Sequence, residues 1–257
     1  MNVKIKEALK NIESDHNVRI LYACESGSRA WGFPSKDSDY DVRFIYIHHP
    51  DWYLSIVEKR AVIELPVDEL LDINGWDIRK VLKLFRKSNP PLQEWLRSRI
   101  VYYRSYSFID RLKDMSNEVF SPISCLYHYL SMASGNYRDY LRGDQVKIKK
   151  CFYVLRPILA CKWIEKYNSI PPLLFNDLLN DIIPEGELKG EINTLYLRKI
   201  SGDELDLEQK IDIINSFIEH ELEHLGEYCK SIKHESIDPI ERLNLLFRNT
   251  LLEVWTT

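Results

Sequence analysis

The chain is 257 residues long, 45% of them hydrophobic and 29% charged, with a formal net charge of −4. This composition is typical of a globular protein with a large core, and it excludes a general electrostatic attraction to nucleic acid, so a polyanion would need a local basic patch. No apolar run reaches the ~18 residues of a membrane span and no signal-peptide core begins the chain, so we expect a cytoplasmic protein without membrane contact.

The N-terminal part mixes helical and strand patterns. Apolar residues from Val3 to Ile12 recur at helical spacing, and Arg19 to Glu25 is an apolar strand. A short helix from Ser28 to Trp31 must end before Pro34, because proline lacks an N–H donor. The run from Asp39 to Ile47 has the clearest strand pattern of the chain. Further strands are predicted at 61–65, 70–73 and 101–103, and helices at 76–87 and 92–96.

After residue 104 the strand patterns stop. Helices are predicted at 107–120, 123–142, 147–167, 173–179, 187–200, 205–230 and 239–255. We therefore predict an α+β fold with two domains: a mixed β-sheet flanked by helices in residues 1–104, and an all-helical domain in residues 105–257. Five scattered cysteines form no Cys-x-x-Cys pair, and we expect them to be buried, reduced thiols.

Two carboxylates open the strand that begins at Asp39. Asp39 and Asp41 are separated by one residue, so their side chains share one face of the strand, roughly 6–7 Å apart. That spacing suits a pair of hard divalent cations. Gly27 and Ser28 form a small-residue turn before a short helix, and backbone N–H groups there can approach a phosphate. The alternative is an acidic surface turn with Asp37 as its turn residue. It explains the sequence around Asp39 and Asp41 less well, because Asp41 lies inside an apolar strand.

These motifs resemble those of the polymerase-beta-like nucleotidyltransferase superfamily, and more narrowly of its RlaP group. The likeness rests on four clusters in order: Gly27 to Phe33, Ser38 to Arg43, Asn74 to Lys80, and Ser88-Asn89-Pro90 with Glu94-Trp95-Leu96. A weaker likeness in Lys150 to Pro157 and in Pro171-Pro172 extends it into the second half.

The resemblance implies a nucleotidyltransferase catalytic domain followed by a helical substrate-binding domain. The implied reaction moves a nucleoside monophosphate from an NTP to a hydroxyl, which can be an RNA end, and releases pyrophosphate. Mg²⁺ or Mn²⁺ would be held by Asp39 and Asp41. Gly27 and Ser28 would take the β- and γ-phosphates, and Arg29 and Arg43 would neutralise charge.

Polymerase-like phosphoryl transfer needs a third carboxylate, which we assign to Asp72. Asp72 stands within the apolar run Leu70 to Ile73, where a solvated side chain is hard to explain. Asp68, Glu64 and Asp77 are the alternatives, and Asp77 is also well placed at a helix start, where the helix dipole favours a carboxylate.

Several cations gather on the helix predicted at 147–167, namely Lys147, Lys149, Lys150, Arg156 and Lys162. Lys150, Tyr153 and Arg156 recur at spacings of three and so share one face. The resemblance places this helix opposite the metal site, and we expect Lys150, Tyr153 and Arg156 to contact a substrate phosphate. The alternative is an ordinary solvated helix face.

Three other functions compete with this interpretation. The fold could serve a non-catalytic nucleotide-binding or antitoxin-like partner, or the acceptor could be a protein or a small molecule instead of RNA. The segment from His220 to His224 matches the H-E-x-x-H pattern of zinc hydrolases. Its histidines fall away from the apolar stripe of their helix, among acids that we expect to be solvated, Glu221 included.

Overall fold

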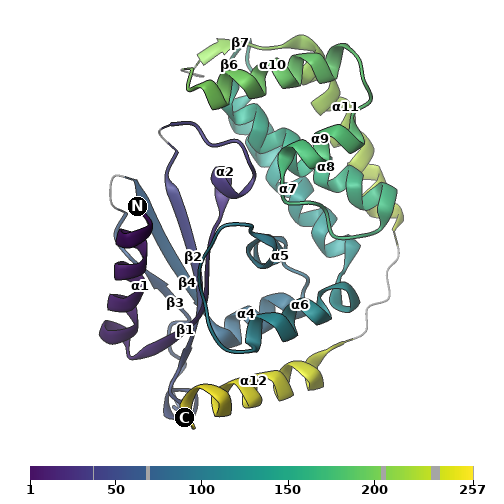
Figure 1. Cartoon of the computed structure of the whole chain (residues 1–257). Coiled ribbons are helices and arrows are strands. Elements are labelled where there is room, and N and C mark those ends of the chain that lie inside the picture. The colour runs from purple at the N-terminus through teal and green to yellow at the C-terminus, as the bar shows by residue number, and fades with distance from the viewer. Residues whose placement is uncertain (37, 68–69, 204–206, 233–237, 257) are drawn as a thin grey trace. The chain divides into compact units, whose positions relative to one another are not determined.

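A computed structural model describes residues 1–36, 38–67, 70–203, 207–232 and 238–256. The chain divides into two compact units, each described here by itself. Unit 1 comprises Met1–Ala30, Asp39–Val119 and Ile237–Thr257, and unit 2 comprises Trp31–Ser38 and Phe120–Ser236. The elements of both are labelled in Figure 1.

Unit 1 is built on a five-stranded sheet with the order β3-β4-β2-β1-β5. Its strands are β1 (Val18–Glu25), β2 (Tyr40–His48), β3 (Val62–Glu64), β4 (Leu71–Asp77) and β5 (Val101–Arg104). Neighbouring strands are antiparallel except β2 and β4, which run parallel. The helices of the unit are α1 (Asn2–His16), α2 (Gly27–Ala30), α3 (Pro50–Tyr53), α4 (Ile78–Arg86), α5 (Pro90–Arg97), α6 (Phe108–Val119) and α12 (Ile240–Trp255).

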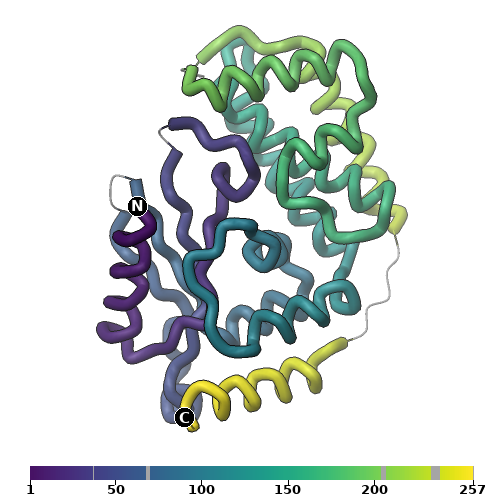
Figure 2. Tube along the Cα trace, in the orientation of Figure 1, coloured from purple at the N-terminus to yellow at the C-terminus, as the bar shows by residue number. Residues whose placement is uncertain are grey.

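Helices cover both faces of this sheet. The stripe Ile5, Leu9 and Ile12 packs α1 onto the face that carries Val42 and Phe44 of β2. Helices α4, α5, α6 and α12 bury their apolar residues against the other face. The C-terminal helix α12 lies beside α4 and α6 (Figure 2). Because side chains alternate along a strand, Asp41 belongs to the face covered by α4 to α6.

Unit 2 is organised around α8 (Cys151–Tyr167), which is buried along most of its length. The segment 31–38 adds Phe33 to this core, where its ring packs 5.2 Å from Phe152 and 5.6 Å from Phe175, centroid to centroid. The other elements are α7 (Pro122–Tyr140), β6 (Gln145–Lys147), the 3-10 helix η1 (Ile148–Lys150), α9 (Phe175–Ile182), α10 (Glu187–Ser201), β7 (Leu207–Gln209) and α11 (Asp212–Ser231).

The α+β fold class is confirmed: a mixed sheet with helices comes first, and the second half is mostly helical. Two details differ from the expectation. Strands β6 and β7 pair into a small antiparallel sheet, so the second half is not all helical and the helix expected from 147 begins at Cys151. The compact units also interleave along the chain instead of meeting near residue 104, because α6 and α12 pack on the sheet of unit 1.

All five cysteines are buried free thiols, as expected. Within the described ranges, no helix combines the length and the apolar character that crossing a membrane requires.

Candidate active site

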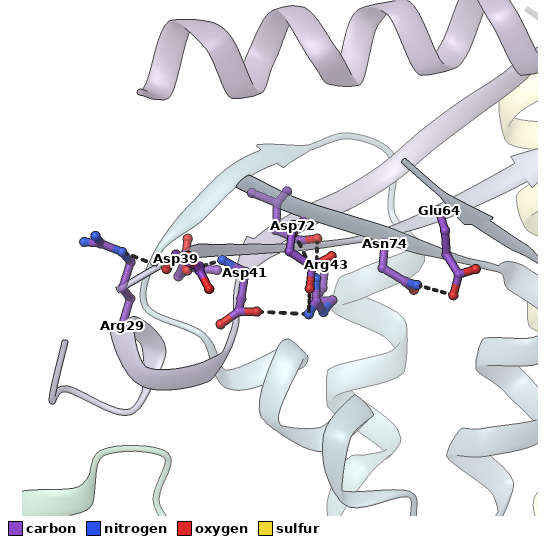
Figure 3. A network of polar contacts seen from close by, with 9 residues as sticks. Arg29, Asp39, Asp41, Arg43, Glu64, Asp72 and Asn74 are labelled. Atoms are coloured by element: carbon purple, nitrogen blue, oxygen red, sulfur yellow. Dashed lines mark hydrogen bonds and ion pairs between the residues drawn. The ribbon is translucent and has the colours of Figure 1, made fainter. Parts of the chain in front are cut away.

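The parallel pairing of β2 with β4 sets two aspartates side by side. Asp41 on β2 is the register partner of Asp72 on β4, so both side chains leave the sheet on the same face (Figure 3). Asp39 immediately precedes β2 and is exposed. The structure thus gathers the three predicted carboxylates at the edge where β2 and β4 begin.

Arg43 lies between two of these carboxylates. Its Nη2 donates to Asp41 Oδ1 at 3.0 Å and to Asp72 Oδ2 at 2.7 Å, and its Nη1 donates to the Asp72 carbonyl at 3.1 Å (Figure 3). Arg43 precedes Ile45 on the same face of β2, so strand alternation alone aims it here. The guanidinium places positive charge where carboxylates would otherwise repel each other.

Three consecutive residues, the last of β1 and the two that follow it, enclose Asp41. Glu25 is buried, and its Oε1 accepts the Asp41 backbone N–H at 2.8 Å. The next residue, Ser26, donates its N–H to the Asp41 carbonyl at 2.8 Å. Gly27 has φ +59°, and a Cβ there would stand 2.1 Å from Asp41 Oδ2. Only glycine therefore leaves room for this position of the carboxylate.

Neighbouring residues form hydrogen bonds with both the side chain and the backbone of Glu25. The Tyr102 hydroxyl donates to Glu25 Oε2, and the Ser98 hydroxyl donates to the Glu25 carbonyl at 2.7 Å. Burial raises the pKa of Glu25, and the hydrogen bonds from Tyr102 and from the Asp41 N–H oppose that rise. The rigid contacts around Glu25 fix the backbone from which Asp41 projects.

Asp41 is the electrostatic centre of this group. Burial raises its pKa first, and the charges of Asp72 and Asp39 raise it further, while Arg43 and Arg29 lower it. A carboxylate with the charges of two further carboxylates nearby is in an environment that favours a cation.

The remaining predicted residues of unit 1 surround the same strand entry. Arg29 stacks its guanidinium on Tyr40, 3.8 Å from the ring centroid, and donates Nε–H to the Asp39 carbonyl at 3.1 Å. Ser28 is buried in α2. Arg29 and Ser28 therefore lie next to the aspartates, on the turn that Gly27 opens.

The alternatives to Asp72 lie elsewhere. Asp77 is buried at the other end of β4, where it caps α4 by accepting the Arg79 N–H at 2.8 Å and also accepts the Tyr53 hydroxyl at 2.7 Å. Glu64 on β3 is exposed and accepts from Asn74 at 2.9 Å. Asp68 and the proposed turn residue Asp37 lie outside the described residues.

The predicted phosphate contacts of the second half lie in unit 2. Lys150 is half-buried, with its Nζ 4.8 Å from the ring centroid of Tyr153. Arg156 is buried in α8, where its guanidinium lies 4.5 Å from the Trp31 ring centroid and donates to the Leu173 carbonyl at 3.3 Å. Their contact with a substrate phosphate stays a prediction.

The H-E-x-x-H segment lies on α11. Glu221 is buried and accepts from Lys162 at 2.8 Å, so the expectation of a solvated side chain was wrong. His224 contacts Glu165 through Nε2 at 2.7 Å. The glutamate that a zinc hydrolase would use as a base is thus occupied by an ion pair.

Comparison with known proteins identifies the family. The family described as RlaP, RNA repair pathway DNA polymerase beta family, matches residues 1–249. The chain belongs to the RlaP family. It is 55% identical over 255 residues to the "Uncharacterized protein YcgL" of Bacillus subtilis (strain 168), covering 99% of this chain and 98% of that protein. The crystal structure of a nucleotidyltransferase-like protein from Exiguobacterium sibiricum 255-15 matches 88% of this chain and 78% of its own at 16% identity and a TM-score of 0.35.

Polymerase-beta-like families such as RlaP typically use a divalent metal, so the donor set has to be tested against one. Within the described ranges, no three Asp, Glu, His or Cys side chains stand close enough together to hold an ion. The guanidinium of Arg43 contacts both Asp41 and Asp72, which marks the space between them as one that takes positive charge. Aspartate oxygens are also the hard donors that Mg²⁺ and Mn²⁺ prefer. Asp41 and Asp72 therefore have the donor chemistry for such an ion, whereas Asp39 does not complete a three-ligand group with them in this structure.

Sequence reasoning missed Glu25 and Tyr102 in this RlaP chain. Glu25 was assigned only to the end of a strand, and Tyr102 to another. One signal was available: a carboxylate directly before a Gly-Ser turn, at the end of an apolar strand, is costly to bury without partners.

Proposed function

We propose that this RlaP protein is a divalent-metal-dependent nucleotidyltransferase. It moves a nucleoside monophosphate from an NTP to a hydroxyl group and releases pyrophosphate. The observation that carries the proposal is the register pairing of Asp41 with Asp72 on parallel strands, with Asp39 beside them and Arg43 between them. Family membership supports the reaction class, and the word RNA in the family description makes an RNA end the first acceptor to test.

In this proposal Asp39, Asp41 and Asp72 hold Mg²⁺ or Mn²⁺. When bound, such an ion neutralises phosphate charge and lowers the pKa of a coordinated hydroxyl. Asp72 also accepts the proton of the attacking hydroxyl. The acceptor oxygen forms a bond to the α-phosphorus, the bond from that phosphorus to the bridging oxygen breaks, and pyrophosphate leaves.

The other residues position substrate. Gly27 and Ser28 take the β- and γ-phosphates through their backbone, and Arg29 faces the developing negative charge from its stack on Tyr40. With a metal held by the aspartates, Arg43 would be free of its carboxylate partners to contact phosphate. In unit 2, Lys150 and Tyr153 contribute a phosphate contact. Buried Arg156 fixes Trp31, whose ring lies 5.9 Å from that of Tyr153.

A labelled-NTP screen tests this function. Each of the four NTPs, labelled at the α- or the γ-phosphate, is incubated with Mg²⁺ and with RNA ends, proteins or small hydroxyl compounds as acceptors. We expect the α-label on an acceptor and the γ-label only in pyrophosphate. Asp41→Asn should abolish transfer, whereas Asp114→Asn, which changes an exposed aspartate of α6, should not.

Two results would overturn the proposal. Transfer of the γ-label to an acceptor would indicate a kinase. Binding of NTP without any transfer, unchanged in Asp41→Asn, would indicate the non-catalytic nucleotide-binding alternative.

A further inference from the structure

Four lysines gather in unit 2, and we call them the lysine cluster: Lys147, Lys149, Lys150 and Lys199. The first three end β6 and form η1, directly before α8, and Lys199 comes from the last turns of α10. The helical pattern of the sequence predicted a row of cations on one helix, and the fold adds Lys199 from another helix.

Aromatic rings lie close to the ammonium groups of three of the four cluster lysines. Lys150 Nζ lies 4.7 Å from the Tyr140 ring centroid, and Lys147 Nζ lies 5.5 Å from the same ring. Lys199 Nζ lies 5.6 Å from the ring of Phe33 and 5.8 Å from that of Phe152. Ring faces attract cations, so they keep these groups in place without neutralising them.

The cluster differs in its counter-ions from five other lysines of its unit. Within the described ranges, none of the four cluster lysines has a carboxylate within salt-bridge distance. Five other lysines of unit 2 do have one, namely Lys162, Lys166, Lys189, Lys210 and Lys230.

Holding these charges together is unfavourable. Lys199 is 7% exposed, and burial, together with the charges of Lys149 and Lys150, lowers its pKa. Partial burial and the charges of Lys149 and Lys147 also lower the pKa of Lys150. The three lysines before α8 stand at the positive end of a 17-residue helix with no acidic residue in its first turn and no side-chain cap. Cations at a helix N-terminus destabilise it.

We propose that the lysine cluster binds a run of phosphate groups, either the oligophosphate chain of a nucleotide or the phosphodiester backbone of a nucleic acid. One carboxylate could not balance the charge of four lysines, whereas a run of phosphates carries several negative charges. The helix N-terminus adds a favourable field for the same anion. The cluster lies within unit 2 and extends the phosphate contact given to Lys150, so in that respect it rests on the proposed function. Its binding of phosphate can be measured without nucleotidyl transfer at the aspartates of unit 1.

Binding to the full-length protein in EDTA tests the proposal, with sodium tripolyphosphate and a single-stranded RNA oligonucleotide as the two probes. Calorimetry should show that Lys149→Ala and Lys199→Met each weaken binding about tenfold. Lys166→Ala is the matched control, because it removes a lysine of α8, in the same unit, that is paired with Asp181, and its binding should stay within about twofold of the parent. For RNA, each cluster variant should also reduce the salt dependence of binding by about one counter-ion.

The two probes distinguish the sources of phosphate. Binding of tripolyphosphate assigns the cluster to an oligophosphate chain, and binding of RNA alone assigns it to a backbone. The idea is overturned if neither probe binds, or if Lys149→Ala, an exposed position whose loss leaves the core intact, binds like the parent. Asp41→Asn should leave binding in EDTA unchanged, so a failure of the proposed reaction and a failure of this site remain distinguishable.

Discussion

Asp72 and Asp77 stand five residues apart on one strand, yet their surroundings differ in kind. Asp72 shares a face with Asp41 and accepts a hydrogen bond from Arg43. Asp77 instead caps α4 and accepts a hydrogen bond from Tyr53. We expect Asp72→Asn to abolish nucleotidyl transfer, because the amide keeps the volume and loses the charge. Asp77→Asn should retain most activity, since an amide oxygen can still cap the helix.

The stability of the same variants provides the control. Asp72→Asn should unfold near the parent temperature. The alanine variant Asp77→Ala should have a free energy of unfolding about 1–2 kcal/mol lower than that of the parent, because it removes a cap acceptor and leaves the Tyr53 hydroxyl without its partner. Thermal unfolding and transfer assays on the same samples measure both. An inactive, stable Asp77→Asn alongside an active Asp72→Asn would move the third carboxylate to Asp77.

Glu25 offers a second prediction at this scale, because it acts on Asp41 through the backbone. Glu25→Gln keeps an oxygen that can accept the Asp41 N–H and should retain transfer within several-fold. Glu25→Leu leaves that N–H unpaired, and we expect kcat/KM to fall on the order of ten- to a hundredfold. If the glutamine variant is as impaired as the leucine variant, the charge of Glu25 matters and the positioning role is wrong.

Individual residues of the site differ in how far the sequence revealed them. Asp39 and Asp41 could be placed on one face because strand alternation is a local rule. The pairing of Asp41 with Asp72, and the position of Arg43 between them, required the register of two strands that are far apart in sequence. The cost of burying a carboxylate could have pointed to Glu25, but its partners could not be predicted, because they are a backbone N–H on β2 and a hydroxyl on β5.

At the scale of elements, the start of α8 is preceded by lysines, and cations at a helix N-terminus lower the stability of the helix. Lys149→Glu places an acid at the positive end of the helix and relieves repulsion within the lysine cluster. We expect it to raise the free energy of unfolding of the ligand-free protein by about 0.5–1 kcal/mol. Lys166→Glu, near the other end of α8, should lower it, because it breaks the pair with Asp181 and opposes the dipole there.

Thermal unfolding without ligand measures this difference in sign. A shift of roughly 1–4 °C upward for Lys149→Glu is expected for a chain of this size. A decrease would mean that Lys149 makes a stabilising contact in the ligand-free protein, contrary to the structure.

Most elements could be predicted, because long periodic patterns fix their type. The strands β6 and β7 could not, since three residues carry no usable period and their pairing joins segments far apart in the chain. The same pairing holds Lys147 in a strand, which is why α8 begins later than its helical pattern suggested.

In the whole molecule, the two units interleave along the chain, and α12 belongs to the unit whose sheet carries the aspartates. Leu243, Leu246 and Val254 of α12 are buried in that core, and Glu253 accepts the Ser107 N–H at 2.8 Å. Removal of residues 238–257 should therefore destabilise unit 1 by several kcal/mol, since each such side chain contributes about 1.5–3 kcal/mol when buried.

Limited proteolysis and transfer activity measure that effect. We expect the truncated protein to be cleaved within unit 1 and to lose activity, although α12 holds none of the proposed site residues. A variant that lacks only residues 256–257 is the control and should behave like the parent. Full activity without α12 would show that the sheet folds without it.

The amphipathic pattern of α12 predicted a helix but could not say which of two cores it covers, so a single boundary at 104 was the simplest sequence-based division.

The late position of α12 in the chain also sets an order of events during synthesis. Every residue of unit 2 leaves the ribosome before residue 240 does, while the sheet of unit 1 waits for its last covering helix (Figure 2). A nascent chain that stalls before α12 would thus carry a complete unit 2 together with an uncovered apolar face of the sheet of unit 1. Such a surface is what chaperones and proteases recognise, so we expect the aspartate site to be completed only after α12 has been synthesised.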